Sequence, residues 1–222
     1  MNPLKDISVD LHMHTLDSDG SIELYDLFEE ILMKGINLFS ITEHETMVNN
    51  SKIKSFARKN NLMYIPGVEL TVNDNGRRHI LGYGVDCQNE KLLKVMKNNQ
   101  AVVSSGRDDE PHLFITPEEA IEAILDAGGV PILAHPGCPI YGPDFKSYVS
   151  KMLSYGVRGI ECFHPENNDE ITKFCIELCN ELDLYITGGS DYHGNCNPLR
   201  KLDMMKLQLD DLKLKDLITM ND

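Results

Sequence analysis

The chain has 222 residues, a length that one α/β domain can reach, and its 41% hydrophobic and 25% charged residues are ordinary for a globular protein. Its 21 basic against 35 acidic residues give a net charge of −14, which disfavours binding to a long phosphate backbone but not to a small phosphorylated substrate held by metal ions. The apolar runs are too short to span a membrane, and the amino-terminal residues contain no apolar signal core. We therefore expect a cytoplasmic protein whose six cysteines are free thiols.

Short apolar runs alternate with segments whose apolar residues recur at the helical period. The runs predict strands at 7–12, 36–42, 62–70, 78–85, 130–134, 157–163 and 184–188. The periodic segments predict helices at 21–34, 48–59, 90–103, 116–126, 144–155 and 168–182. Repeated strand–helix units are typical of a mainly parallel sheet with helices outside it.

Local signals set some of the boundaries. Ser21 is expected to cap the first helix, and Gly35 to end it. Thr116 precedes a proline and two glutamates, which predicts the start of a helix. Residues 104–112 are polar and have no period, which predicts a loop, while the tail at 199–220 shows no clear pattern.

Histidines and carboxylates gather where the predicted strands end. Seven of the eight histidines lie on or next to a strand end, and His112 in the polar loop is the exception. Taken singly, each is more often a structural side chain than a ligand, and even His12 and His14, which share one side of an extended strand, are weak evidence. Structural histidines would scatter over helices, loops and both strand ends, so the joint pattern is informative. Because functional groups of parallel α/β folds meet at the carboxyl ends of the strands, we expect one cluster there.

The residue types indicate which ions such a cluster would bind. Histidine with Asp and Glu, and without thiolate, suits Zn, Mn or Fe in a catalytic site that keeps open positions. Six histidines and three carboxylates are too many for one ion. The sequence therefore predicts a site for two or three divalent ions.

A family resemblance is carried by six short motifs in this order: DLHMHTLDSDGS, ITEHET, PGVELT, HILGYG, AHPG and GSDYHG. From Asp10 to about Gly194, the sequence resembles the PHP (polymerase and histidinol phosphatase) family. The resemblance implies a distorted (β/α)7 barrel, with residues 1–222 as a single domain. It also implies up to three divalent metals at the carboxyl ends of the strands and cleavage of phosphate esters. Within the family, the chain is similar to small stand-alone phosphoesterases acting on nucleotides, such as the 3′,5′-nucleoside bisphosphate phosphatases.

The resemblance also implies a ligand set, with Glu69 as the carboxylate that bridges two ions. Carried over by position, the first ion takes His12, His14, Glu69 and Asp191, the second takes Glu69, His79 and His135, and the third takes Asp19, His44 and His193. Glu69 and Asp191 are accordingly expected to be essential for catalysis.

Substrate contacts are expected from side chains outside the ligand set. His164 follows a strand that ends at the cluster, and in similar sequences a histidine there lies near the substrate phosphate. We expect it to contact phosphate or protonate the leaving group, with a plain surface histidine as the alternative. Arg107, Arg158 and Arg200 are candidate phosphate contacts, although Arg107 and His112 lie in the polar loop, where exposure to solvent is the simpler interpretation.

Two features depart from the family pattern. Glu43 and Glu45 replace the aspartates that usually flank the ligand His44, which changes the side-chain length beside that ligand. Only 55 residues separate His79 from His135, where bisphosphate phosphatases of this type carry a sizeable helical insertion that helps to form the substrate pocket. We expect the metal site to survive this difference, whereas the identity of the substrate does not carry over.

The predicted function is hydrolysis of a phosphate monoester in a small metabolite, first of all a nucleotide, by attack of a metal-bridging hydroxide. The alternatives are a histidinol-phosphate phosphatase, an exonuclease on short oligonucleotides and a non-catalytic metal-binding module that regulates a partner. The acidic charge weighs against long substrates, and the complete set of nine ligands weighs against the regulatory module. The expected partner is a small phosphorylated metabolite rather than long nucleic acid or a membrane.

Overall fold

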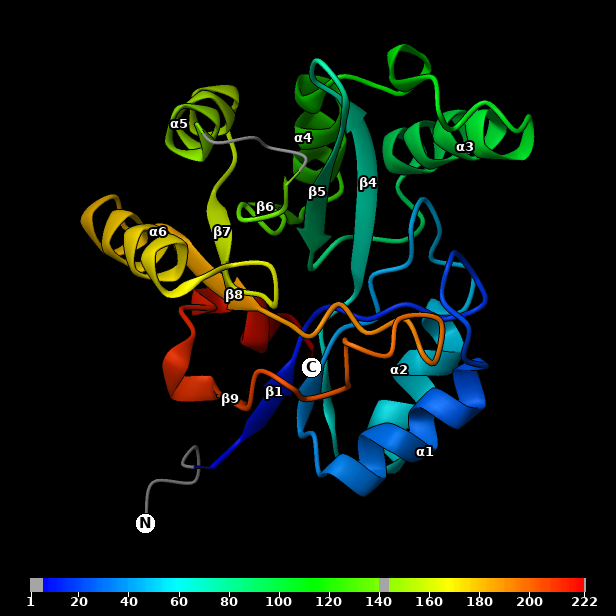
Figure 1. Cartoon of the computed structure of the whole chain (residues 1–222). Helices are drawn as coiled ribbons and strands as arrows, with labels where there is room; N and C mark the ends of the chain where they lie inside the picture. Colours follow the sequence, from blue (N-terminus) through cyan, green and yellow to red (C-terminus); the bar gives the residue numbers. More distant parts are fainter. Residues whose placement is uncertain (1–5, 140–143, 222) are drawn as a thin grey trace.

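Strands and helices alternate along the computed structural model, which describes residues 6–139 and 144–221 (Figure 1). The first elements are β1 (Ser8–Asp10), α1 (Leu24–Lys34), β2 (Leu38–Phe39), α2 (Asn50–Lys59), β3 (Met63–Tyr64), β4 (Gly67–Asn73), β5 (Arg77–Tyr83) and α3 (Glu90–Ser104). The next are the 3-10 helix η1 (Pro111–Leu113), α4 (Pro117–Asp126), β6 (Val130–Leu133), α5 (Phe145–Tyr155), β7 (Gly159–Phe163) and α6 (Asp169–Glu181). The chain continues with β8 (Tyr185–Gly188), β9 (Leu207–Gln208), and the 3-10 helices η3 (Leu209–Asp211) and η4 (Lys215–Asn221).

The strands form two sheets. One has the order β3-β2-β1-β9, and the other has the order β4-β5-β6-β7-β8. Neighbours are parallel from β1 to β3 and from β6 to β8, whereas β9 is antiparallel to β1 and β5 is antiparallel to both β4 and β6. The mixed α/β fold is confirmed. The (β/α)7 barrel stays a prediction, because neither sheet closes on itself over the described ranges.

Isolated bridges connect the two sheets just beyond the carboxyl ends of β1 and β2. Met13 pairs in parallel with Tyr192, which follows β8, and His44 pairs in parallel with Glu69 in β4. These bridges bring the carboxyl ends of both sheets to one place.

Three apolar layers hold this arrangement. The first lies between the four-stranded sheet and helices α1 and α2, where the rings of Phe28 and Phe56 stack with their centroids 3.9 Å apart. The second lies between the five-stranded sheet and helices α3 to α6, which surround that sheet in Figure 1. The third joins the two sheets and includes Val9, Leu38, Leu81 and Ile132.

The strand predicted at 62–70 is wrong as a single element. Its first part is β3, and its second part begins β4, which belongs to the other sheet. The chain changes sheets at Pro66, a residue with no N–H to donate to a neighbouring strand. This change of sheet places Glu69 on the five-stranded sheet, while His12 and His14 extend from the four-stranded one.

The first helix begins three residues later than predicted, at Leu24, and Ser21 is not its cap. Glu23 occupies the cap position without a side-chain hydrogen bond. Ser21 instead fastens the loop that follows β8: its hydroxyl donates to the His193 carbonyl at 3.0 Å and accepts from the Cys196 N–H at 2.9 Å. The residue that looked like a helix cap therefore supports a strand-end loop.

Other boundaries agree with the sequence signals. Gly35 ends α1 in the left-handed region, with φ of 70°. Thr116 and Glu119 form a reciprocal capping box at the start of α4. The polar loop at 104–112 runs from the end of α3 into η1. No helix in the described ranges has the length and the apolar character needed to cross a membrane.

Candidate metal centre

The structure brings the nine predicted ligands into one cluster, although they come from both sheets. His12 and His14 follow β1, His44 follows β2, and Glu69 and His79 lie in the β4–β5 hairpin. The other four lie after β6, after β8 or before α1: His135, Asp191, His193 and Asp19. Every member has a nitrogen or oxygen atom no more than 3.4 Å from that of another member.

The innermost group has the spacing of ligands around a single ion. Nε2 of His12 lies 3.1 Å from Nε2 of His14, 3.0 Å from Oε2 of Glu69 and 3.2 Å from Oδ1 of Asp191. Nε2 of His14 lies 3.2 and 3.3 Å from the same two oxygens. Atoms bound about 2.0–2.2 Å from a common ion lie roughly 3.0–3.5 Å from one another, so these four donors fit a divalent cation.

Glu69 faces a different set of nitrogens with each carboxylate oxygen. Oε2 faces His12 and His14, and His44 Nε2 lies 3.4 Å from it. Oε1 lies 3.1 Å from His79 Nδ1 and 3.0 Å from His135 Nε2, and these two nitrogens are 3.2 Å apart. A carboxylate with one oxygen in each of two donor groups has the geometry of a bridging ligand.

A third group forms around Asp19 and is more open. Its Oδ1 lies 3.4 Å from Nε2 of His193 and 3.7 Å from Nδ1 of His14, and its Oδ2 lies 3.7 Å from Nε2 of His44. The Asp19 side chain is 54% exposed, whereas that of Glu69 is only 1% exposed. The donors present therefore suit a third ion at the rim, held less tightly than the inner group.

Glu161 in β7 is a member of the site that the sequence did not predict. One of its oxygens lies 2.8 Å from His12 Nδ1, and the other accepts the His135 backbone N–H at 2.9 Å. Because a carboxylate can only accept, Nδ1 of His12 carries a hydrogen, and Nε2 is the nitrogen that can bind an ion when the ring is neutral. The one signal in the sequence was a carboxylate inside an otherwise apolar strand.

Burial and charge act in opposite directions at these groups. Burial alone would raise the pKa of Glu69, but His12, His44 and His79 hold it well below its usual range. The same holds for Glu161, whose pKa the neighbouring histidines, His12 foremost, lower to about 2. Burial opposes protonation of His12, yet Glu161 and Glu69 outweigh it and raise its pKa to about 10. These carboxylates stay ionised and attract a cation, which suits divalent metal ions.

Two of the predicted ligands have an unusual backbone conformation. His135 has φ of 28° and Asp191 has φ of 50°, both on the positive side that non-glycine residues seldom adopt. His135 lies two residues after the end of β6, and Asp191 lies three residues after the end of β8. Such conformations persist where the surroundings enforce them, and they concentrate at functional sites. Here they accompany side chains that enter the donor cluster.

The two glutamates that flank His44 are tied to the scaffold. Glu43 accepts the Thr15 N–H at 3.0 Å, and Glu45 accepts the Thr71 N–H at 2.6 Å and the Asn99 amide at 2.9 Å. Within the described residues, the buried Nδ1 atom of His44 has no hydrogen-bond partner. The longer side chains therefore fix the loops around the ligand without orienting its imidazole.

His164 is fully buried, which excludes the surface alternative. Its Nδ1 accepts the Glu166 N–H at 3.0 Å, so its Nε2 carries the hydrogen and lies 3.3 Å from Oδ2 of Asp191. Burial holds the pKa of His164 well below its usual value, which keeps the imidazole neutral. Both nitrogens are thus engaged by the protein, and the geometry favours orientation of Asp191 over direct contact with phosphate.

The candidate arginines separate into one at the cluster and two away from it. Arg200 binds Glu166 at 3.0 Å and also Asp191, and it lines the cavity over the cluster. Arg107 forms a bidentate pair with Glu110 at the surface, at 2.7 and 2.9 Å. Arg158 precedes β7 and so lies at the amino end of that strand, opposite to the ligands. The structure brings neither Arg107 nor Arg158 to the site, and His112 is likewise exposed in its loop.

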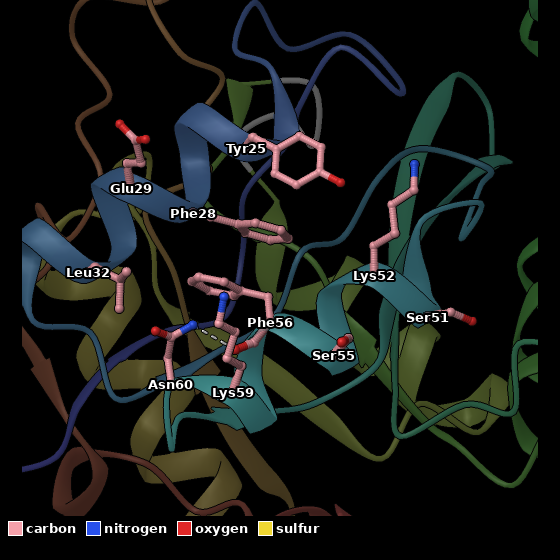
Figure 2. Close-up of a pocket in the computed structure, with 10 residues that line it drawn as sticks. All are labelled: Tyr25, Phe28, Glu29, Leu32, Ser51, Lys52, Ser55, Phe56, Lys59 and Asn60. Carbon is pink, nitrogen blue, oxygen red and sulfur yellow. Dashed lines mark hydrogen bonds between the residues drawn. The ribbon is translucent and has the colours of Figure 1, made fainter.

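Cavity size alone does not locate this site. The hollow over the cluster measures about 320 Å³ and is lined by the rim ligands, Arg77, Cys138 and Arg200. A larger groove of about 610 Å³ runs between α1 and α2, over the stacked rings of Phe28 and Phe56 (Figure 2). Its lining combines aromatic and aliphatic side chains with serine, lysine, Glu29 and Asn60, and the groove contains no group of converging metal donors among the described residues.

Comparison with known families gives the family of this chain. The model of the PHP domain matches residues 10–126, just over half of the chain. This chain belongs to the PHP domain family. The match confirms the resemblance carried by the motifs, and the matched segment contains six of the nine predicted ligands of the PHP site.

Relatives of this PHP-domain chain include enzymes that cleave different phosphate esters. A phosphoribosyl 1,2-cyclic phosphate 1,2-diphosphodiesterase of Eggerthella lenta is 23% identical over 83% of this chain and 94% of the relative. A 5′-3′ exoribonuclease of Haemophilus influenzae is 22% identical, over 84% and 90%. A 3′,5′-nucleoside bisphosphate phosphatase of Chromobacterium violaceum is 21% identical, over 84% and 87%.

A solved structure agrees with the fold. A Bifidobacterium adolescentis protein assigned to the metal-dependent phosphoesterases has a TM-score of 0.81, with 21% identity and 96% coverage of both chains. Together the comparisons confirm the predicted enzyme class, a metal-dependent phosphoesterase of the PHP family, at a level that does not distinguish the ester.

The donor geometry generates a prediction about metal content. We expect the protein reconstituted with Zn, Mn or Fe to hold two to three equivalents of divalent metal, because the donors fall into three groups, two of which share Glu69. Loading should also raise the melting temperature, since ions that bind only the folded state stabilise it by mass action. Elemental analysis and thermal unfolding measure both effects. One equivalent or less after full reconstitution would contradict three donor groups.

A second prediction compares two carboxylates. Glu69→Gln should reduce turnover by at least about 100-fold, because the change removes charge from a buried ligand shared by two groups. Asp19→Asn should reduce turnover less, because Asp19 is half exposed and its nearest nitrogens are 3.4–3.7 Å away. The exposed Glu177→Gln on α6 is the matched control. Near-normal turnover in Glu69→Gln would show that the bridge is assigned wrongly.

Proposed function

We propose that this PHP-domain protein hydrolyses the phosphate monoester of a small phosphorylated metabolite, with a nucleotide as the leading class of substrate. The observation that carries the proposal is Glu69, buried between two groups of histidine nitrogens with one oxygen toward each. Such an arrangement suits two ions a few ångströms apart. Many enzymes that catalyse nucleophilic displacement at a phosphorus atom use two ions at this spacing. The cavity of about 320 Å³ above it has room for a phosphate and part of its alcohol.

The residues divide the work between holding ions and holding the substrate. His12, His14, Glu69 and Asp191 would hold one ion, Glu69, His79 and His135 a second, and Asp19, His44 and His193 a third. Divalent ions such as Zn, Mn or Fe supply an activated water of pKa near 7 and offset charge on the phosphoryl oxygens. Among the three predicted arginines, Arg200 is best placed to neutralise a phosphoryl oxygen. Its guanidinium lines the cavity, where it pairs with the carboxylate of the ligand Asp191.

Orientation of Asp191 is the role that we assign to His164. One oxygen of Asp191 faces His12 and His14, and the other faces His164 and Arg200. The neutral imidazole donates its Nε2 hydrogen to that second oxygen and thereby fixes the plane of the carboxylate. His164 is thus a positioning residue, in contrast to the general acid suggested by its place in the sequence.

Charge and cavity dimensions support a small substrate. The net charge of −14 repels a polyanion away from the ions themselves. The relatives named above act on a cyclic phosphate, on RNA and on a nucleoside bisphosphate, so nucleotide chemistry recurs among them while the bond cleaved varies. Three alternatives are distinguished by the test below: hydrolysis of histidinol phosphate, hydrolysis of short oligonucleotides, and a regulatory domain without catalytic activity.

We further propose that the two sheets act as one distorted seven-stranded barrel around the site. The support is the pair of bridges between them, from the residues after β1 to those after β8 and from the residues after β2 to β4. With these bridges, a ring runs through β1, β2, β4, β5, β6, β7 and β8. The ions would then lie at the carboxyl mouth of this ring.

The proposed reaction is tested by phosphate release from a panel of esters, with Mn, Zn or Fe added separately to metal-free protein. We expect turnover on nucleoside monophosphates or bisphosphates and little on a labelled oligonucleotide. Preference for histidinol phosphate would replace the nucleotide class. Progressive shortening of the oligonucleotide would establish the exonuclease. If the protein binds two or more metal ions and releases phosphate from none of the esters, the result would contradict a phosphatase and favour the regulatory module.

The role of His164 generates its own prediction. His164→Ala should weaken metal binding by about 10- to 100-fold, because the carboxylate that it orients is a ligand. Turnover should fall equally for p-nitrophenyl phosphate and for an alkyl phosphate, and excess metal should restore it. Chelator competition and steady-state rates measure this. Unchanged metal affinity, with loss confined to the alkyl phosphate, would instead show that His164 donates the leaving-group proton.

A further inference from the structure

Arg77 at the start of β5 is a cation that the metal cluster does not use. It lines the cavity above the cluster together with His79, which lies two residues further along the strand. Residues two apart on a strand point to the same side, so Arg77 and His79 share the face that the cluster occupies. Arg78 lies between them and points away, over the ring of Tyr148 at 5.8 Å.

The Arg77 guanidinium has no anionic partner within the described part of the chain. Its Nε is buried without a hydrogen bond, and its contact is with the Phe114 ring, 5.8 Å from the guanidinium carbon. An unpaired charged donor is unusual, and it is notable in a protein with 35 acidic against 21 basic residues. A planar fork of N–H groups held over a ring is suited to the oxygens of a phosphate or a carboxylate.

Arg77 also stands where two cavities meet. The cavity over the cluster and a second one of about 450 Å³ share Asp19, His44 and Arg77 in their linings. The second cavity extends outward to Gln100, Val103 and Ser104 at the end of α3. If the phosphate of a substrate lies at the cluster, the rest of the substrate can therefore extend past Arg77 into the second cavity, toward α3.

Strand geometry gives the separation between the two positions. β5 pairs residue by residue with β4, with His79 opposite Thr71 and Arg77 opposite Asn73, further toward the hairpin turn. Two residues of an antiparallel strand span roughly 7 Å, so Arg77 lies about that far outward from the ligand His79. This outward position, at which Arg77 also lines the second cavity, suits a second group on the same molecule.

We propose that Arg77 binds a second anionic group of the substrate, a phosphate or carboxylate roughly 7 Å from the phosphate that is cleaved. The inference rests on the proposed phosphatase function and narrows its substrate to phosphate esters that carry a second anionic group. Arg77 is a specificity residue of this chain that holds this second group, and the adjoining cavity, which is also lined by Asp17, Glu45 and Asp108, receives an uncharged part of the alcohol.

The test measures binding with ligands that cannot be hydrolysed. Mn-loaded protein is titrated by calorimetry with butylphosphonate, with butane-1,4-bisphosphonate and with 5-phosphonopentanoate. The two ligands with a second anionic group should bind wild type about 10- to 100-fold more tightly than butylphosphonate, the usual gain from a charge-assisted pair. Arg77→Gln should abolish that advantage and leave the affinity for butylphosphonate within about threefold, while Arg77→Lys should keep part of it.

Arg78→Gln is the matched control, because the same charge is removed from the opposite face of the same strand. It should leave the affinity for all three ligands unchanged, with melting temperatures confirming that each variant is folded. Equal loss for all ligands in Arg77→Gln would overturn the proposal and place Arg77 on the phosphate at the metals. An intact advantage for the ligands with a second anionic group would overturn it as well. Hydrolysis of p-nitrophenyl phosphate by wild type reports separately on the phosphatase function, so either idea can fail alone.

Discussion

The site depends on one carboxylate, Glu69, that is buried where the two sheets meet. A buried ionised carboxylate is destabilising by several kcal/mol unless it is well paired, and here five imidazoles surround it. Neutral imidazoles that point lone pairs at a carboxylate do not stabilise it. The cluster is therefore balanced only when cations, as metal ions or protons, lie between the donors. Divalent metal ions meet this requirement with the donor types that are present.

Hydrogen bonds from backbone N–H groups to buried carboxylates hold the strand ends that carry the ligands. Asp10 in β1 accepts the N–H groups of His12, Ser190 and Asp203, at 3.3, 2.9 and 3.0 Å, and so fixes the ends of β1 and β8 together. Glu161 does the same beneath the ligands from β7. Ligand positions are set by strand ends that cannot shift separately. Changes in the outer loops can then alter the substrate without disturbing the metals, as the variety among the relatives suggests.

Much of the ligand set could be predicted from sequence, because residues two apart share a strand face and parallel strands end together. His12 with His14, and Asp191 with His193, carry that spacing. The sheet change at Pro66 could not be predicted from apolar runs, because both parts of 62–70 are equally apolar. Glu161 and Arg77 are single residues without a repeated pattern, and only their three-dimensional neighbours reveal them. Ser21 shows a different kind of error. It is a residue type that often caps helices, but here it holds the loop after β8.

The ligands of the centre lie far apart in the sequence, and this separation affects how the site forms during folding. Glu69 lies 57 residues from His12 and 66 from His135, so no local segment of the newly synthesised chain can hold an ion with these donors. The full donor set can form only once both sheets have formed and met. An ion that needs all of these donors would therefore bind a nearly complete cage, which would select it by size and geometry. Ions bound there would fasten the two sheets to each other, so that transient separation of the sheets would be linked to release of metal.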